Sequence, residues 1–190
     1  MEPLHCAPGS LIAASPDLLD PNFMHAVVLM VGHEAEGALG LVVNRPAGVT
    51  VDALLPQHPL LSEQRFPVHN GGPVGRDTLQ FLHRVPRRIP GGVEVSDGLY
   101  LGGEIDALAQ YLARRRRTLA LREIKLLIGY AGWGAGQLDE ELTGGSWLPA
   151  AARPEWIFEP EPDGLWRQVV RSLGPRASGL ADLPPDVSWN

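Results

Sequence analysis

The sequence has very little cysteine: Cys6 is the only one among 190 residues. A single cysteine excludes an internal disulfide and a zinc site built from several thiolates. The chain therefore has to fold through an apolar core alone, and its length is sufficient for one domain with such a core. We expect residues 1–175 to form this domain and residues 176–190 to be a partly ordered C-terminal tail, in a reducing compartment.

Long hydrophobic runs are also missing. No segment approaches the roughly 20 apolar residues that a membrane-spanning helix requires. The first ten residues, MEPLHCAPGS, have neither the basic start nor the apolar stretch of a secretion signal. These absences predict a soluble, cytoplasmic protein that has no membrane partner.

Lysine is nearly absent, since Lys125 is the only one beside 15 arginines, and the formal net charge is -6. Nucleic-acid binders usually carry a basic stripe, which an acidic chain of this kind does not favour. The one basic run, Arg114–Arg117, lies at the end of a predicted helix, where cations interact favourably with the helix dipole. Alternatively, these arginines would bind phosphate or an acidic partner. We favour the dipole interpretation and expect no direct binding of nucleic acid.

Apolar periodicity predicts both strands and helices. Two β-branched runs, His25–Val31 and Ala38–Asn44, are separated by a short polar link, which favours a β-hairpin. Glu104–Arg115 has apolar residues at helical spacing. Further strands are predicted at Phe66–His69, Leu79–His83, Val93–Val95, Ile124–Tyr130 and Trp156–Phe158, and further helices at Thr50–Leu55 and Asp163–Leu173. The irregular order of these elements predicts an α+β fold.

A segment rich in glycine and tryptophan, Gly129–Leu142, is predicted to leave the strand as a turn and to end in a short helix. Phosphate-binding loops have the same order of strand, glycine turn and helix. The spacing differs, because Gln137 stands where the third glycine of G-x-G-x-x-G is required, and no Walker motif follows. Glu140 and Glu141 also oppose a bound phosphate. We therefore do not interpret this segment as a phosphate loop.

No catalytic or metal-binding motif is complete. His69, His83 and Glu141 are candidates for an enzyme pocket, and His33 with Glu34 adds further atoms able to ligate a metal. H-E-x-x-H is absent, and so is the G-x-S-x-G setting of a nucleophilic serine. The sequence predicts no metal and no cofactor. An enzyme of unknown type, with a pocket near the two histidines and the glutamate, stays open as an alternative.

Several motifs in one order resemble those of the YqgE/AlgH family, also called UPF0301 or DUF179. They are Leu19–Phe23, Glu36–Pro46, Gly71–Val74, Phe81–His83, and Gly129–Leu138 with Glu141, Leu142 and Trp147. The resemblance extends from about Ser10 to Leu173. It implies a bacterial cytoplasmic protein of the α+β class, with a mixed sheet that has a small closed barrel-like portion surrounded by helices. It implies no reaction and no catalytic residues.

The turns most typical of this family predict where the protein binds its partner. Turns that rigid strands position commonly carry function. We predict a non-enzymatic module that binds a small molecule or a protein and has an indirect regulatory role. Its ligand-binding residues are predicted to be Asn70, Gly71, Gly72, Trp133, Gly134 and Gln137.

Two alternatives to this binding surface stay open. In the first alternative, the glycines of the Gly129–Leu142 segment serve only to bend the chain, while Trp133 and Trp147 fill a hydrophobic corner. Members of the family are also sometimes labelled transcriptional regulators, but no helix-turn-helix with a basic recognition helix is present, so we do not expect direct DNA binding. The sequence specifies neither the ligand nor the oligomeric state.

Overall fold

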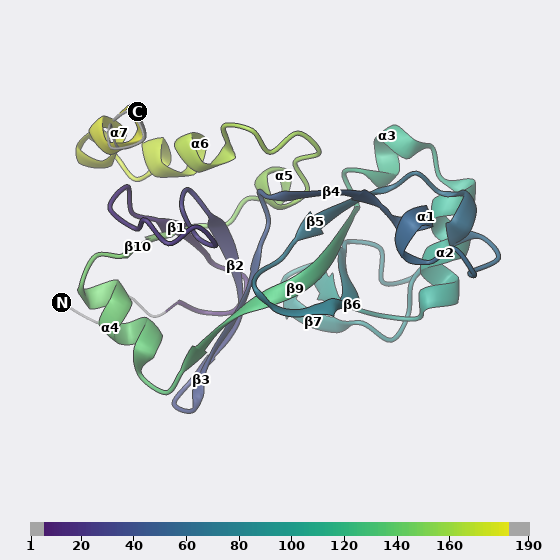
Figure 1. The fold of residues 1–190 in the computed structure, drawn as a ribbon, viewed down its shortest axis with the longest axis horizontal. Helices are drawn as coiled ribbons and strands as arrows, with labels where there is room; N and C mark the ends of the chain where they lie inside the picture. Colours follow the sequence, from purple (N-terminus) through teal and green to yellow (C-terminus); the bar gives the residue numbers. More distant parts are fainter. Residues whose placement is uncertain (1–5, 183–190) are drawn as a thin grey trace.

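The computed structural model describes residues 6–182, in which ten strands form one sheet (Figure 1). Their order across the sheet is β10-β1-β2-β3-β9-β6-β8-β7, with β5 added to β9 and β4 added to β5. All of the pairs are antiparallel except β5 with β9. The strands are β1 (Leu11–Ala14), β2 (Val27–Glu34), β3 (Gly37–Val42), β4 (Pro46–Thr50), β5 (Pro67–Asn70), β6 (Val74–His83), β7 (Val93–Ser96), β8 (Leu99–Leu101), β9 (Ile124–Gly134) and β10 (Trp147–Ala150).

The prediction of a mixed sheet with a small closed barrel-like portion is wrong. Closure requires the two edge strands to pair with each other, whereas β10 pairs only with β1 and β7 only with β8 within residues 6–182. The 11-residue strand β9 is longer than any of its neighbours. One of its edges therefore accommodates first β5 and then β3, while the other edge pairs with β6. The resulting sheet is open and largely antiparallel.

Seven α-helices and one 3₁₀ turn accompany the sheet in the part of the chain that the structure describes. Figure 1 shows α1, α2 and α3 together at one end of the sheet, α4 at the other, and α6 and α7 beside β1 and β10. None of these helices has the length and apolar character needed to span a bilayer. The helices are α1 (Val51–Leu54), η1 (Leu61–Glu63), α2 (Ile105–Arg114), α3 (Arg117–Ala120), α4 (Gln137–Thr143), α5 (Pro154–Ile157), α6 (Leu165–Ser172) and α7 (Pro175–Ala181).

Three apolar clusters form the core. The first lies between the sheet and α5–α7 and includes Leu29, Leu127 and Trp166. The second lies between the sheet and α1–α3 and includes Leu108, and the third surrounds Trp147 beside α4. Of the predicted tail, Pro175–Ala181 forms α7 against the first cluster, and residues 183–190 lie outside the described residues.

Strong local patterns led to correct predictions of secondary structure. The predicted hairpin is confirmed as β2 and β3, and the predicted helix Glu104–Arg115 is confirmed as α2. The predicted strand Trp156–Phe158 is wrong, because Pro154 begins the short helix α5 at this point. A brief apolar run does not distinguish a strand from a buried helical turn, and here Trp156 and Ile157 both pack into the first cluster.

The predicted turn within Gly129–Leu142 begins later than expected. Strand β9 continues to Gly134, and its residues Ala131–Gly134 pair with Gly37–Gly40 of β3. Gly129 has a φ of +74°, and a Cβ there would lie 2.3 Å from the carbonyl oxygen of Gly72. This glycine therefore permits a close approach between β9 and the turn that joins β5 to β6. The chain leaves the sheet only at Gly136, the left-handed residue before α4.

Two of the family-like motifs contact each other directly. The guanidinium of Arg45 donates to the backbone carbonyls of Pro21, Asn22 and Met24, the last at 2.8 Å. These contacts join the 19–23 motif to the bend between β3 and β4. Both motifs therefore contribute to the same corner of the fold.

Candidate functional site

The first predicted binding turn, Asn70–Gly72, packs tightly against β9. The Asn70 side chain accepts the N–H of Gly72 at 3.2 Å, and the N–H of Gly71 donates to the carbonyl of Ile128 at 2.7 Å. A Cβ on Gly72 would lie 2.1 Å from the carbonyl carbon of Tyr130. The glycines of this turn are therefore required by close packing of the backbone.

The second predicted binding segment forms a closed hydrogen-bond network around Glu141. Its Oε2 accepts the indole N–H groups of Trp133 at 2.9 Å and Trp147 at 2.8 Å. Its Oε1 accepts the amide of Gln137 at 2.9 Å, and Gln137 in turn accepts the N–H of Gly134 at 3.0 Å. The two indole rings lie edge to face at 5.8 Å. The hydrophobic corner predicted for the two tryptophans is confirmed.

The structure does not bring these two segments together. Gly72 lies beside Tyr130, and Gly134 follows four residues further along β9, which corresponds to about 13 Å of extended strand. A shared ligand-binding role for the six residues stays a prediction.

The residues of the alternative enzyme pocket are also separated. His83 lies opposite Ile124 at the start of β9, and His69 lies on β5 beside the first half of the same strand. Glu141 contacts Trp133 near the other end of β9. Within residues 6–182, no group of three histidine, cysteine, aspartate or glutamate side chains is arranged to hold a metal.

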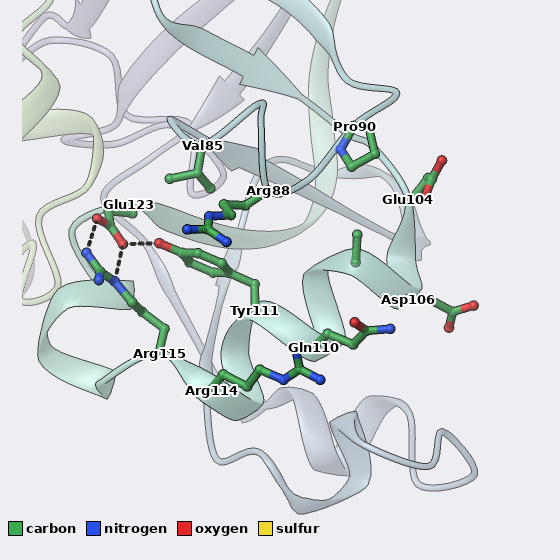
Figure 2. A pocket seen from close by; sticks show the side chains of 11 residues that line it. Val85, Arg88, Pro90, Glu104, Asp106, Gln110, Tyr111, Arg114, Arg115 and Glu123 are labelled. Carbon is green, nitrogen blue, oxygen red and sulfur yellow. Dashed lines mark hydrogen bonds and ion pairs between the residues drawn. The ribbon is translucent and has the colours of Figure 1, made fainter.

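A groove of about 720 Å³ lies between α2 and the loop of residues 84–92 (Figure 2). None of the predicted ligand-binding or enzyme-pocket residues lines it. Arg114 and Arg115 of the arginine run do. The lining residues are Val85, Arg88, Pro90, Glu104, Asp106, Ala107, Gln110, Tyr111, Arg114, Arg115 and Glu123.

His83 connects the loop of residues 84–92 to the segment just before α2. It is fully buried, and burial lowers the pKa of its imidazole, which is therefore neutral. Its Nδ1 accepts the N–H of Val85 at 3.3 Å, so the proton lies on Nε2, which donates to the carbonyl of Gly102 at 3.0 Å. A backbone bond from Glu104 to Pro90, 2.9 Å long, reinforces this connection. The groove thus has a fixed width at its base.

One end of the groove is a closed network around Glu123. The Arg115 guanidinium donates to both carboxylate oxygens, at 3.0 and 2.7 Å, and the Tyr111 hydroxyl donates to one of them. Burial, together with the bond to the carboxylate, raises the pKa of Tyr111 to about 12. Burial opposes ionisation of Glu123, but the donors from Arg115 and Tyr111 outweigh it and lower the pKa of the carboxyl. Arg115 is therefore neutralised within the protein.

Arg88 and Arg114 differ from Arg115, because both are exposed and neither has a carboxylate within ion-pair distance among residues 6–182. Arg88 extends from the loop and Arg114 from α2 (Figure 2). A guanidinium offers several donors in a planar fork that fits carboxylate or phosphate oxygens. Three guanidiniums and three carboxylates line the groove, but Arg88 and Arg114 have no ion-pair partner of their own among residues 6–182.

The four consecutive arginines do not form one basic patch. Arg114 lines the groove, Arg115 pairs with Glu123, and Arg117 donates to the carbonyl of Arg65. The side chains of these consecutive arginines therefore lie in separate surroundings. Glu104 and Asp106 lie toward the other end of the groove from Arg115 (Figure 2), and the Asp106 carboxylate lies 3.3 Å from the His58 ring nitrogen.

The fold and the groove together define an α and β protein with an open antiparallel sheet and a charged surface groove. Residues 11–178 match the family model described as DUF179, AlgH-like, and the chain belongs to this family. A UPF0301 protein of Chlorobaculum tepidum, CT0663, is 38% identical over 93% of this chain and 92% of its own length. A UPF0301 protein of Streptomyces avermitilis is 38% identical over 96% of this chain and 94% of its own. The names of these bacterial relatives state no biochemical activity.

Two solved structures have the same fold. The solution structure of the AlgH protein from Pseudomonas aeruginosa has a TM-score of 0.71 and 28% identity, with 97% of each chain covered. The crystal structure of protein DIP2367 from Corynebacterium diphtheriae has a TM-score of 0.77 and 20% identity, with 96% of this chain and 95% of the other covered. The second likeness shows the fold alone.

The sequence-based prediction missed the groove. Its helix was predicted only from the apolar face, and no role was predicted for the loop of residues 84–92. The density of arginine in residues 84–88 and 114–117, which contribute to the two walls of the groove, is the signal that marks it.

Proposed function

We propose that the protein is a cytoplasmic, non-enzymatic binding module that takes an anionic group of a small molecule or a partner protein between Arg88 and Arg114. The observation that carries this proposal is the pair of exposed guanidiniums, on two walls of one groove, without a carboxylate partner among residues 6–182. Bidentate contacts to both would hold a carboxylate or phosphate.

The ionisable groups at the Glu123 end of the groove support binding over proton transfer. A general acid or base works best when its pKa lies near the operating pH. The pKa of Tyr111 is raised to about 12 and that of Glu123 is lowered. Both groups therefore keep one protonation state near neutral pH.

A regulatory role of this module is proposed to be indirect. The net charge of -6 and the divided arginine run favour a small anion or an acidic segment of a protein over DNA. An anion that contacts both Arg88 and Arg114 would link the loop to α2. Occupancy would then stabilise one arrangement of these two walls for a partner to recognise.

The double substitution Arg88→Gln and Arg114→Gln should weaken the binding of inorganic pyrophosphate at least about tenfold, because each lost charge-assisted contact is worth about 1.5 to 3 kcal/mol. The measurement is a titration followed by backbone-amide NMR signals, which locates the bound ion as well as its affinity. In the parent protein, the signals of residues 84–92 and 104–115 should shift.

Arg87→Gln is the matched control, since Arg87 is exposed and adjacent to Arg88 but does not line the groove. This variant should retain the parent affinity. Pyrophosphate that binds the double variant as tightly as the parent, or that shifts signals only outside the groove, would show that the groove is not the site.

A further inference from the structure

A second cavity, of about 290 Å³, lies where the bend before β2, the bend after β3 and the start of α6 meet. Each of these three parts contributes one basic side chain, namely His25, Arg45 and Arg167. The three residues are far apart in the sequence, so only the fold brings them to one place. The cavity is separate from the groove, and the two share no lining residue.

Hydrogen bonds fix the Arg45 guanidinium beside this cavity. Three of its N–H donors are used by backbone carbonyls of residues 21, 22 and 24. A guanidinium has five N–H donors, so two are not used by these carbonyls. The Asn44 side chain donates to the carbonyl of His25 at 2.9 Å and accepts the N–H of Val27 at 2.8 Å, which holds both bends together.

The imidazole of His25 is held by stacking and lines the cavity. The ring lies 4.2 Å from the ring of Trp166, with 27° between the planes, and the Trp166 N–H is used by the carbonyl of Ala14 at 2.8 Å. The backbone of His25 has a φ of +57°, which residues with a Cβ rarely adopt. Within residues 6–182, no hydrogen bond is recorded for either nitrogen of this ring.

Both charges that act on the His25 imidazole are positive. Arg167 is exposed and has no carboxylate within ion-pair distance in the described part of the chain. Burial lowers the pKa of His25, and the charges of Arg167 and Arg45 lower it further. Asp163 is the one carboxylate that lines the cavity, and Asp20 acts on Arg45 from outside it. Two guanidiniums therefore face one carboxylate.

From this arrangement we propose that the cavity is a second binding site, which takes a small oxyanion such as phosphate between His25, Arg45 and Arg167. The oxyanion accepts the unused N–H donors of Arg45, the fork of Arg167 and a ring N–H of His25. Its negative charge compensates the two guanidiniums, which no other group in the cavity does completely. This site is independent of the function proposed for the groove.

The test is the titration of His25 by NMR of labelled histidine side chains, with the signal identified by its loss in His25→Gln. Inorganic phosphate should raise the pKa of His25 by about 1, because a negative charge within about 4–6 Å favours the imidazolium. Potassium chloride at equal ionic strength should not produce this change. Arg167→Gln should raise the pKa of His25 without phosphate and weaken phosphate binding about tenfold.

Arg171→Gln is the control on the same helix, since Arg171 pairs with Asp182 and does not line the cavity. It should leave the pKa of His25 and the phosphate affinity unchanged. The proposal is overturned if phosphate does not alter the pKa of His25, or if Arg167→Gln binds phosphate as the parent does. Phosphate that shifts only the signals of the groove also overturns it, while leaving the groove proposal intact.

Discussion

Glu141→Ala should lower the free energy of unfolding by about 2 to 6 kcal/mol, because two buried indole N–H donors lose one shared acceptor and each costs about 1–3 kcal/mol when unsatisfied. Trp133 is 7% exposed and Trp147 only 2%, so water does not readily replace the carboxylate. The substitution also removes the acceptor of the Gln137 amide N–H, while the Gln137 oxygen keeps its bond from Gly134 at the end of β9. Urea unfolding followed by tryptophan fluorescence measures the change.

Glu140→Ala is the matched control, because Glu140 is the preceding residue on α4 and its exposed side chain makes no recorded hydrogen bond within residues 6–182. Its effect should stay below about 0.5 kcal/mol, as is usual for surface positions. Equal unfolding midpoints for the two variants would show that Glu141 does not hold this corner together.

The second large effect concerns Lys125, which should make the protein more stable as the pH rises from 7 to 10. This side chain is 3% exposed, and its Nζ donates to the carbonyl of Val43 at 2.7 Å. Burial lowers the pKa of its ammonium group to about 7, partly opposed by Glu159. The free energy of unfolding should increase by about 3–4 kcal/mol more over this range than in Lys125→Met.

The sign follows from the two protonation equilibria of Lys125. The pKa is about 7 in the folded state and 10.5 in the unfolded chain. Between these values the unfolded chain binds more protons, so raising the pH favours the folded state. The neighbouring His69 has its pKa lowered to about 3 by burial and by Lys125, so it titrates below this window. Parallel stability curves for the two proteins between pH 7 and 10 would contradict the assignment.

The sequence alone was sufficient where a pattern is local and long. The alternation of apolar runs around residues 32–37 predicted the hairpin, because both strands and their link lie within one short segment. The apolar stripe of Glu104–Arg115 predicted α2 for the same reason. The order of several short motifs also identified the family, since that comparison does not depend on knowing what the motifs contact.

The roles of those motifs depend on partners that are distant in the chain. Arg45 donates hydrogen bonds to carbonyls more than 20 residues away in the chain. Glu141 accepts the indole N–H groups of two tryptophans that lie on different strands. Strand β9 continues through its glycines because β3 supplies hydrogen bonds on one edge, which no local propensity predicts. The prediction of a closed barrel was wrong for a related reason, because the closure of a sheet depends on whether its two edge strands pair with each other.

Both proposed sites also depend on residues that are distant in the chain. The groove exists because His83 joins the loop of residues 84–92 to the start of α2, and the cavity exists because three separate bends meet around His25. Periodicity determined the type of the long, regular elements, and the order of the motifs determined the family of the chain. Only the tertiary structure decided which arginines have no ion-pair partner within residues 6–182, because the partner of each one is set by packing and not by its neighbours in the sequence.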